Sequence, residues 1–146
     1  MASCGIAAGA QQVYNKLREI KKADQLNIEL TKTGCIGMCY REPLVEITDD
    51  TGSYLYGEVN EQKAVEIMEK HIQEDEPVGE YIVKSSMFET RDDAFWEGQV
   101  KITLKNCGVI DPESITEYEK REGYQALQEI VNENISREVV IQTIIE

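Results

Sequence analysis

A short loop with two cysteines constrains this chain more than any other stretch. The loop reads Gly34-Cys35-Ile36-Gly37-Met38-Cys39, and an apolar run begins soon after it at Leu44. Glycines permit positive φ angles and close backbone approach, so the N–H groups of such a turn can point at an anionic sulfur. An iron–sulfur cluster or a thiolate-bound metal requires this setting, and Ile36 and Met38 are placed to shield it from water. Two buried cysteines in an ordinary turn are the alternative.

The composition excludes several classes of partner and environment. The chain has 146 residues and a formal charge of −13, which makes nucleic acid an unsuitable partner because phosphate binding needs a basic face. No apolar run reaches membrane-spanning length, so we expect no membrane insertion. Four cysteines without a charged-then-apolar leader favour a reducing compartment, and we expect a cytoplasmic protein.

The charge is distributed unevenly along the chain. Residues 1–72 carry 8 basic and 11 acidic side chains, whereas residues 73–146 carry 7 basic and 17 acidic ones. The step coincides with the polar stretch 73–77. We therefore predict two parts, residues 1–76 and residues 77–146.

The first part has the periodicities of an α/β domain. Apolar residues at helical spacing predict a helix over 9–23, and alternation predicts a half-buried strand over 27–33. A turn signal at 49–52 predicts a hairpin of strands 44–48 and 53–56. Asn60 is a suitable N-cap for a helix that ends at 72. This order predicts a small sheet with flanking helices.

The second part is mostly helical in pattern. Residues 81–83 and 100–104 have the composition of strands, and Phe88, Phe95 and Trp96 are expected to be apolar packing anchors. Helices are predicted over 112–121, over 124–131 and from 136 onward. The last helix is apolar and has no stop signal, which we interpret as a chain cut short.

With these motifs assembled, the chain resembles the N-terminal part of flavoprotein subunits of NAD(P)-linked hydrogenases, NADH dehydrogenases and formate dehydrogenases. The first part looks like a thioredoxin-like [2Fe–2S] ferredoxin domain, on the basis of residues 4–10, 33–39, 42–45 and 56–59. The second part looks like the segment that connects this domain to an FMN- and NAD-binding domain, on the basis of residues 104–114 and 123–124. The resemblance implies FMN and NAD(P) only on a downstream domain.

The resemblance also implies a set of cluster ligands. Cys35 and Cys39 match the family's loop pair, and Cys4 matches the second member of its early pair. The companion of Cys4 has no counterpart here, so three thiols match where a [2Fe–2S] cluster normally takes four. Ser3 is a weak oxygen candidate. Cys107 has no ligand role in the family pattern and is interpreted as a small buried hydrophobe, with a fourth-ligand role as the alternative.

Two structural expectations follow from the same resemblance. The first strand of a thioredoxin-like domain is apparently missing, so we expect residues 81–83 or 100–104 to pair with an exposed sheet edge, in the same chain or across a homodimer. Pro43 stands where such folds place a cis-proline, so we expect a cis Glu42–Pro43 bond. His71, the only histidine, is interpreted as a favourable charge near a helix end.

Two functions from different classes are therefore open. The first is an electron-transfer module, itself not catalytic, that passes electrons through a [2Fe–2S] cluster within a redox complex of several subunits. The second is an assembly module that keeps the scaffold, lacks the cluster and docks onto other subunits. Zinc bound by the thiols is a further alternative. A thiol–disulfide enzyme is disfavoured, because three residues separate Cys35 from Cys39.

Overall fold

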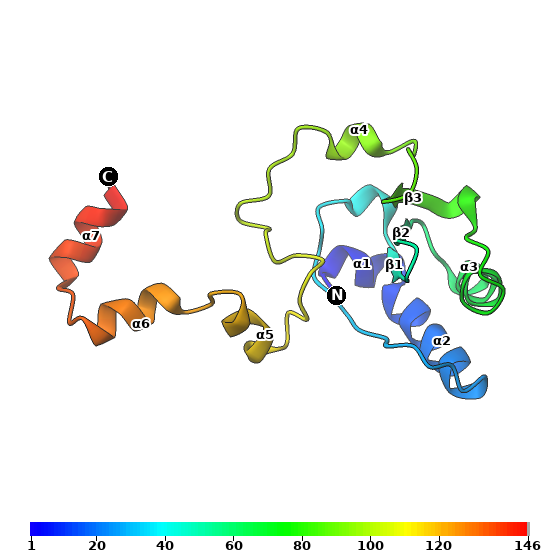
Figure 1. Cartoon of the computed structure of the whole chain (residues 1–146), viewed down its shortest axis with the longest axis horizontal. Helices are drawn as coiled ribbons and strands as arrows, with labels where there is room; N and C mark the ends of the chain where they lie inside the picture. The colour runs from blue at the N-terminus through cyan, green and yellow to red at the C-terminus, as the bar shows by residue number, and fades with distance from the viewer. Residues whose placement is uncertain (146) are drawn as a thin grey trace. The chain divides into compact units, whose positions relative to one another are not determined.

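The computed structural model describes residues 1–145 and divides the chain into two compact units, Met1–Val109 and Ile110–Glu146. In the first unit, helices lie against a three-stranded sheet (Figure 1). Its elements are α1 (Ser3–Ala8), α2 (Ala10–Ala23), the 3₁₀ turn η1 (Cys39–Arg41), β1 (Val45–Thr48), β2 (Ser53–Tyr56), α3 (Glu61–Ile67), the π-helical turn η2 (Met68–Gln73), the 3₁₀ turn η3 (Gly79–Tyr81), β3 (Ile82–Ser85) and α4 (Asp93–Trp96).

The sheet is antiparallel throughout, in the order β1-β2-β3. The predicted hairpin is confirmed, with Val45 opposite Tyr56 and Thr48 opposite Ser53. Its turn is held by Asp49, whose carboxylate accepts hydrogen bonds from the N–H groups of Thr51 and Gly52. The prediction that residues 81–83 pair with a sheet edge is also confirmed, because β3 pairs with β2 in the same chain. Residues 100–104, the other candidate strand, form no strand.

Two apolar clusters lie on the sheet. The larger joins α2, α3 and strand residues such as Tyr56, and it includes Ile67, which is completely buried. The smaller consists of Met38, Leu55 and Val83, with Ile36, Leu44, Phe95 and Trp96 packed against it. Complete burial of one such side chain contributes about 1.5–3 kcal/mol, so the two clusters fix the sheet relative to its helices.

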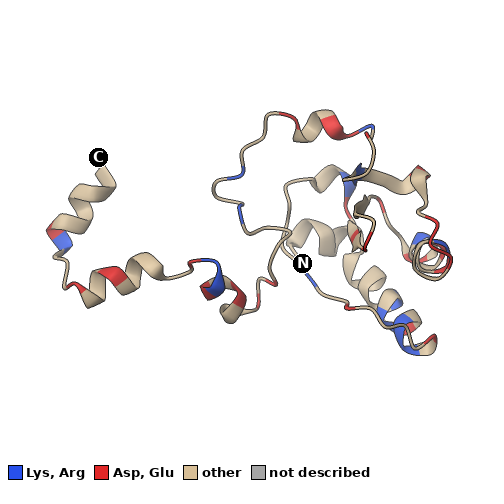
Figure 2. Ribbon diagram, viewed as in Figure 1, with Lys and Arg blue, Asp and Glu red and all other residues tan. Residues whose placement is uncertain are grey.

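The helices begin and end for identifiable reasons. Gly9, with a φ of 104°, ends α1 and begins α2 in a conformation that favours glycine. Lys21 and Lys22 lie in the last turn of α2, where positive charge stabilises a helix (Figure 2). The side chain of Asn60 accepts a hydrogen bond from the N–H of Lys63, as expected for the N-cap of α3.

The predicted strand over residues 27–33 is wrong. Its burial alternates as expected, with Ile28 and Leu30 packed on the larger cluster while Asn27 and Glu29 are exposed. A strand must form hydrogen bonds with a neighbouring strand, and among the described residues no strand pairs with this segment. The alternation therefore reflects packing of an extended chain.

The first unit extends past the boundary that the charge step predicts after residue 76. β3 completes the sheet, and Val83 is completely buried in the smaller cluster. Further along, the ammonium group of Lys101 lies 4.8 Å from the ring centre of Trp96. The charge of a segment indicates how well its surface is solvated. The contacts that extend the first unit depend instead on apolar and aromatic residues, which are scattered through an acidic sequence.

The second unit is helical, as predicted. It comprises α5 (Ile115–Lys120), α6 (Gln125–Asn132) and α7 (Arg137–Ile145). Ser114 caps α5 by accepting a hydrogen bond from the N–H of Glu117. Within residues 1–145, no helix has the length and apolar character needed to cross a lipid bilayer.

Candidate metal centre

Three of the four cysteines converge. The sulfur of Cys39 lies 3.6 Å from that of Cys4 and 3.8 Å from that of Cys35, although 35 residues separate Cys4 from Cys39. Two thiolates bound tetrahedrally to one metal at 2.3 Å lie about 3.8 Å apart. Separations of 3.6 and 3.8 Å match those of sulfurs that share a metal or neighbouring metals, and free thiols in contact have the same separations.

The helix α1 brings Cys4 to the loop through a close backbone approach. Gly5 is buried, and a Cβ atom at this position would lie 3.0 Å from Oε2 of Glu42. The same oxygen accepts a hydrogen bond from the N–H of Leu44 at 3.1 Å. The absence of a side chain at residue 5 thus lets α1 pack against the segment that follows Cys39.

The cysteine loop has the geometry that its glycines predict. Gly37 has a φ of 93°, a conformation that L-residues with side chains rarely adopt, and its N–H donates to the sulfur of Cys35 at 3.3 Å. Met38 is completely buried and packs on Leu55 and Val83, which anchors the loop to the sheet. The loop therefore covers one side of the three sulfurs with apolar groups, while Cys4 and Cys39 are exposed.

The turn after Cys39 is held from several directions. Arg41 forms ion pairs with Asp92 at 3.0 Å and with Glu58 at 3.2 Å, and its carbonyl oxygen accepts the N–H of Glu58. The Glu42–Pro43 bond is cis, as the resemblance predicts. Arg41 and Asp92 were not identified from the sequence, since 51 residues separate them and neither belongs to a motif.

The ionisation of Cys39 depends on the two neighbouring thiols. Hydrogen bonds with Cys4 and then Cys35, together with the charges of the same two groups, raise the pKa of the Cys39 thiol to about 11. Neighbouring groups of like charge resist ionising together unless a cation is present. The arrangement therefore favours a protonated Cys39 thiol in the free protein and a thiolate when a cation is bound.

The three sulfurs lie close together, but they are not arranged as a site for a single metal ion. Among the described residues, no group of three or more histidine, cysteine or acidic side chains is arranged so that it could hold a metal ion. A [2Fe–2S] cluster divides its protein ligands between two irons, so it does not require three ligands at one point. The donor set and its separations fit such a cluster.

Cys107 lies close to this loop in the fold. Gly108 has a φ of 82°, and a Cβ atom on it would lie 2.6 Å from Cγ2 of Ile36. The Cys107 N–H donates to the carbonyl of Leu104. Cys107 is partly exposed rather than buried, so its interpretation as a small buried hydrophobe is wrong.

His71 lies in the last turn of η2, at the helix end that the sequence predicts, and it is also part of a buried network. Its side chain is 1% exposed and shares hydrogen bonds with the Tyr56 hydroxyl at 2.7 Å and the Asp49 carboxylate at 3.0 Å. The Val78 N–H donates to the same hydroxyl at 3.3 Å. The network links the hairpin turn to η2.

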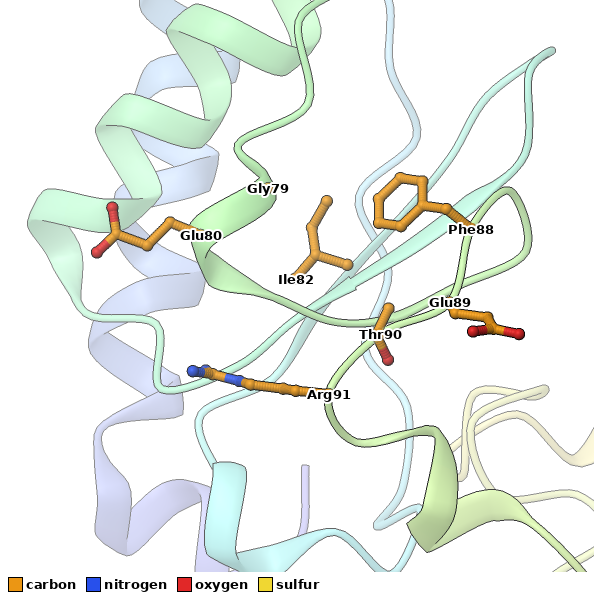
Figure 3. Close-up of a pocket in the computed structure, with 7 residues that line it drawn as sticks. All are labelled: Gly79, Glu80, Ile82, Phe88, Glu89, Thr90 and Arg91. Carbon is orange, nitrogen blue, oxygen red and sulfur yellow. The ribbon is translucent and has the colours of Figure 1, made fainter.

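A hollow lies away from the cysteines, against β3. It is lined by Gly79, Glu80, Ile82, Phe88, Glu89, Thr90 and Arg91. Figure 3 shows that its residues come from η3, from β3 and from the loop that follows β3. The lining contains neither cysteine nor histidine, and it carries charges of both signs, so it shows no donor set for a metal.

Comparison with known proteins gives two informative similarities. The chain is 32% identical over 80 residues to the NADP-reducing hydrogenase subunit HndB of Solidesulfovibrio fructosivorans; the match covers 53% of this chain and 64% of that subunit. The structure also matches a thioredoxin-like [2Fe–2S] ferredoxin from Aquifex aeolicus, with a TM-score of 0.52 and 27% identity over 56% of this chain and 76% of the ferredoxin.

No protein-family model matches the chain. The two similarities support the resemblance drawn from the cysteine motifs and confirm the expected thioredoxin-like fold. The chain is therefore similar, over about half of its length, both to a hydrogenase subunit and to a thioredoxin-like [2Fe–2S] ferredoxin.

Proposed function

We propose that this chain is an electron-transfer module of a hydrogenase-type, NAD(P)-linked oxidoreductase complex, and that Cys4, Cys35 and Cys39 hold a [2Fe–2S] cluster in it. The observation that carries the proposal is the approach of Cys4 to Cys39 at 3.6 Å from a distant part of the sequence. Three thiols without a disulfide suit a soft metal centre in a reducing compartment, and we assign the protein to the cytoplasm on this basis.

When bound, such a cluster supplies a one-electron carrier whose potential depends on hydrogen bonds to its sulfurs and on solvent exposure. The chain's own residues control both factors. Gly37 donates its N–H to the sulfur of Cys35, and Met38 excludes water on the sheet side. The exposed sulfurs of Cys4 and Cys39 leave the opposite side open for a redox partner.

The residues beside the exposed sulfurs suit contact with another protein. Ile6 on α1 and Tyr40 in η1 are 52% and 54% exposed, and each lies within two residues of a cysteine ligand. Aromatic residues are enriched at protein interfaces. We assign the partner's contact surface to this rim, and we assign FMN and NAD(P) to a downstream domain. A homodimer through the sheet edge at β1 stays a prediction.

An assembly module without a cluster is the second candidate function. It is favoured by one specific observation: within the described part of the chain, three sulfurs contact one another, whereas a cluster takes four. On this account the thioredoxin-like scaffold serves only to dock onto other subunits. Neither function involves bond chemistry by this chain, because hydride transfer belongs to flavin and nicotinamide.

Anaerobic purification of the full chain tests the proposal. The first candidate function predicts visible absorbance from cysteine-to-iron charge transfer and an EPR signal after reduction with dithionite. Cys39→Ser should abolish or shift both signals, because Cys39 is the sulfur that contacts the other two. Colourless, iron-free protein that still binds a hydrogenase-type partner subunit would contradict the first candidate and select the second.

A further inference from the structure

The position of Cys107 bears on the missing fourth ligand. A [2Fe–2S] cluster takes four protein ligands, normally all thiolates, and three thiols converge around Cys39. The chain has one more cysteine, Cys107, and it is not in a disulfide. It follows the others by 68 residues or more in sequence but lies in the same compact unit.

The packing of Gly108 on Ile36 places Cys107 beside the cysteine loop. Because a Cβ at Gly108 would lie only 2.6 Å from Cγ2 of Ile36, the backbone here is in direct contact with that side chain. Ile36 immediately follows Cys35, and Cys107 immediately precedes Gly108. Consecutive Cα atoms are about 3.8 Å apart, so both cysteines lie within one residue step of this contact.

The turn that carries Cys107 is ordered by its own hydrogen bonds. The N–H of Cys107 donates to the carbonyl of Leu104 at 3.0 Å, and the N–H of Val109 donates to that of Asn106 at 3.1 Å. Gly108 takes the positive φ that this turn requires. Upstream, Lys101 lies over the ring of Trp96, which packs on the same cluster as Ile36. The segment thus contacts the loop at Gly108 and contacts Trp96, on the same apolar cluster, at Lys101.

Other donors near the three sulfurs are less suitable. Glu42 Oε2 already accepts the N–H of Leu44, and carboxylates are harder ligands than iron–sulfur clusters prefer. Ser3 is an exposed hydroxyl. His71, the only histidine, is engaged with Tyr56 and Asp49 in the other apolar cluster.

We infer that Cys107 supplies the fourth thiolate of the [2Fe–2S] cluster, so that a segment beyond the ferredoxin-like sheet completes the site. The inference rests on the proposed function. On binding, the Cys107 thiol releases its proton to solvent and its sulfur donates an electron pair to iron, with no change in oxidation state. Coordination of iron by Cys107 then links residues 97–109 to the cysteine loop.

The test uses the full chain, reconstituted anaerobically with ferrous iron and sulfide. After exposure to a chelator, Cys107→Ala should retain about one tenth or less of the iron that the wild type retains, because one ligand is lost. Cys107→Ser should keep part of the cluster with shifted absorbance and EPR spectra, because an oxygen replaces sulfur. Cys4→Ser provides the reference for loss of a ligand, and Ser3→Ala should leave iron retention and spectra unchanged.

A second variant keeps all four thiols. Gly108→Ala introduces a Cβ against Ile36, whereas Gly98→Ala introduces one at a similar positive φ with open space around it. Gly108→Ala should therefore weaken iron retention and Gly98→Ala should not. Alkylation of the loaded wild type needs no variant at all, and Cys107 should be protected together with the other three thiols.

Each outcome is decisive for one of the two claims. A wild type that binds a [2Fe–2S] cluster, with Cys107 freely alkylated and with Cys107→Ala unchanged in iron and spectra, would overturn the inference and leave the proposed function intact. Loss of the cluster in Ser3→Ala instead would overturn it too. A wild type that binds no cluster under any of these conditions would overturn the proposed function itself.

Discussion

Arg41 and Asp92 form an ion pair of 3.0 Å that joins the turn after Cys39 to the segment before α4. The side chains are 20% and 10% exposed, so this pair is largely removed from water. Oδ2 of Asp92 and Nε of Arg41 have no hydrogen-bond partner among the described atoms. The pair therefore holds the cysteine loop and the later segment together.

Asp92→Ala should loosen that connection. The variant leaves a largely buried guanidinium with only Glu58 as its acidic partner, and removing one member of a buried pair is strongly destabilising. We expect a clearly lower urea midpoint for the cluster-free protein and faster loss of iron from the loaded protein. Glu58→Gln, at a carboxylate that is 52% exposed, is the control and should change the midpoint much less. Equal effects of the two variants would contradict the account.

Gly57→Ala should be destabilising for a steric reason. A Cβ on Gly57 would lie 2.7 Å from Cγ1 of Val83, which is completely buried. Overpacking of this kind costs about 1–3 kcal/mol in the free energy of unfolding. Gly79→Ala, with open space around it, is the control and should stay within about 0.5 kcal/mol of the wild type. In urea unfolding, the double variant Gly57→Ala/Val83→Ala should lose less than the sum of its parts.

The hairpin and the principal helices follow directly from the sequence. Val13 and Leu17, at helical spacing, are buried on the predicted face of α2, and the turn at Asp49 joins β1 to β2 as its residues indicate. These features depend on local chemistry, which a single sequence contains. The convergence of Cys4 with Cys39 was implied by the family resemblance and not by any local pattern.

The features that sequence did not predict depend on contacts between distant residues. Residues 27–33 have the alternation of a strand, but a strand must pair with a neighbour, and no strand in residues 1–145 pairs with this segment. The increase in negative charge after residue 76 indicates a well-solvated surface. It does not indicate that Val83 is buried. No sequence pattern predicts that Gly108 lies against Ile36, because a glycine is equally suited to a turn that contacts nothing.

Truncation separates the observed unit from the boundary that charge predicts. A fragment of residues 1–109 keeps the whole sheet and both apolar clusters, so it should fold by itself and unfold cooperatively in urea. A fragment of residues 1–76 lacks Ile82 and Val83, whose burial contributes about 1.5–3 kcal/mol each. Circular dichroism during urea unfolding checks this, and a stable 1–76 fragment would contradict the sheet described here.

The Asp49 carboxylate should make stability depend on acid pH. The Thr51 hydroxyl and then the Gly52 N–H, with a further bond from His71, hold its pKa well below the usual value. A pKa that is lower in the folded chain stabilises the fold above about pH 4, and this contribution is lost as the pH falls below that value. Between about pH 4 and pH 2, the urea midpoint of cluster-free wild type should therefore fall more steeply than that of Asp49→Asn. Parallel curves would show that this carboxylate does not contribute.

The most direct test of the central claim is chemical analysis of the full chain for iron, zinc and acid-labile sulfide after anaerobic purification. The three converging sulfurs predict about two iron and about two sulfide per chain, and Cys39→Ser purified in parallel should contain far less of both. Protein that folds and carries neither iron nor sulfide, or that carries zinc without sulfide, would contradict the account of this chain as an iron–sulfur electron-transfer module.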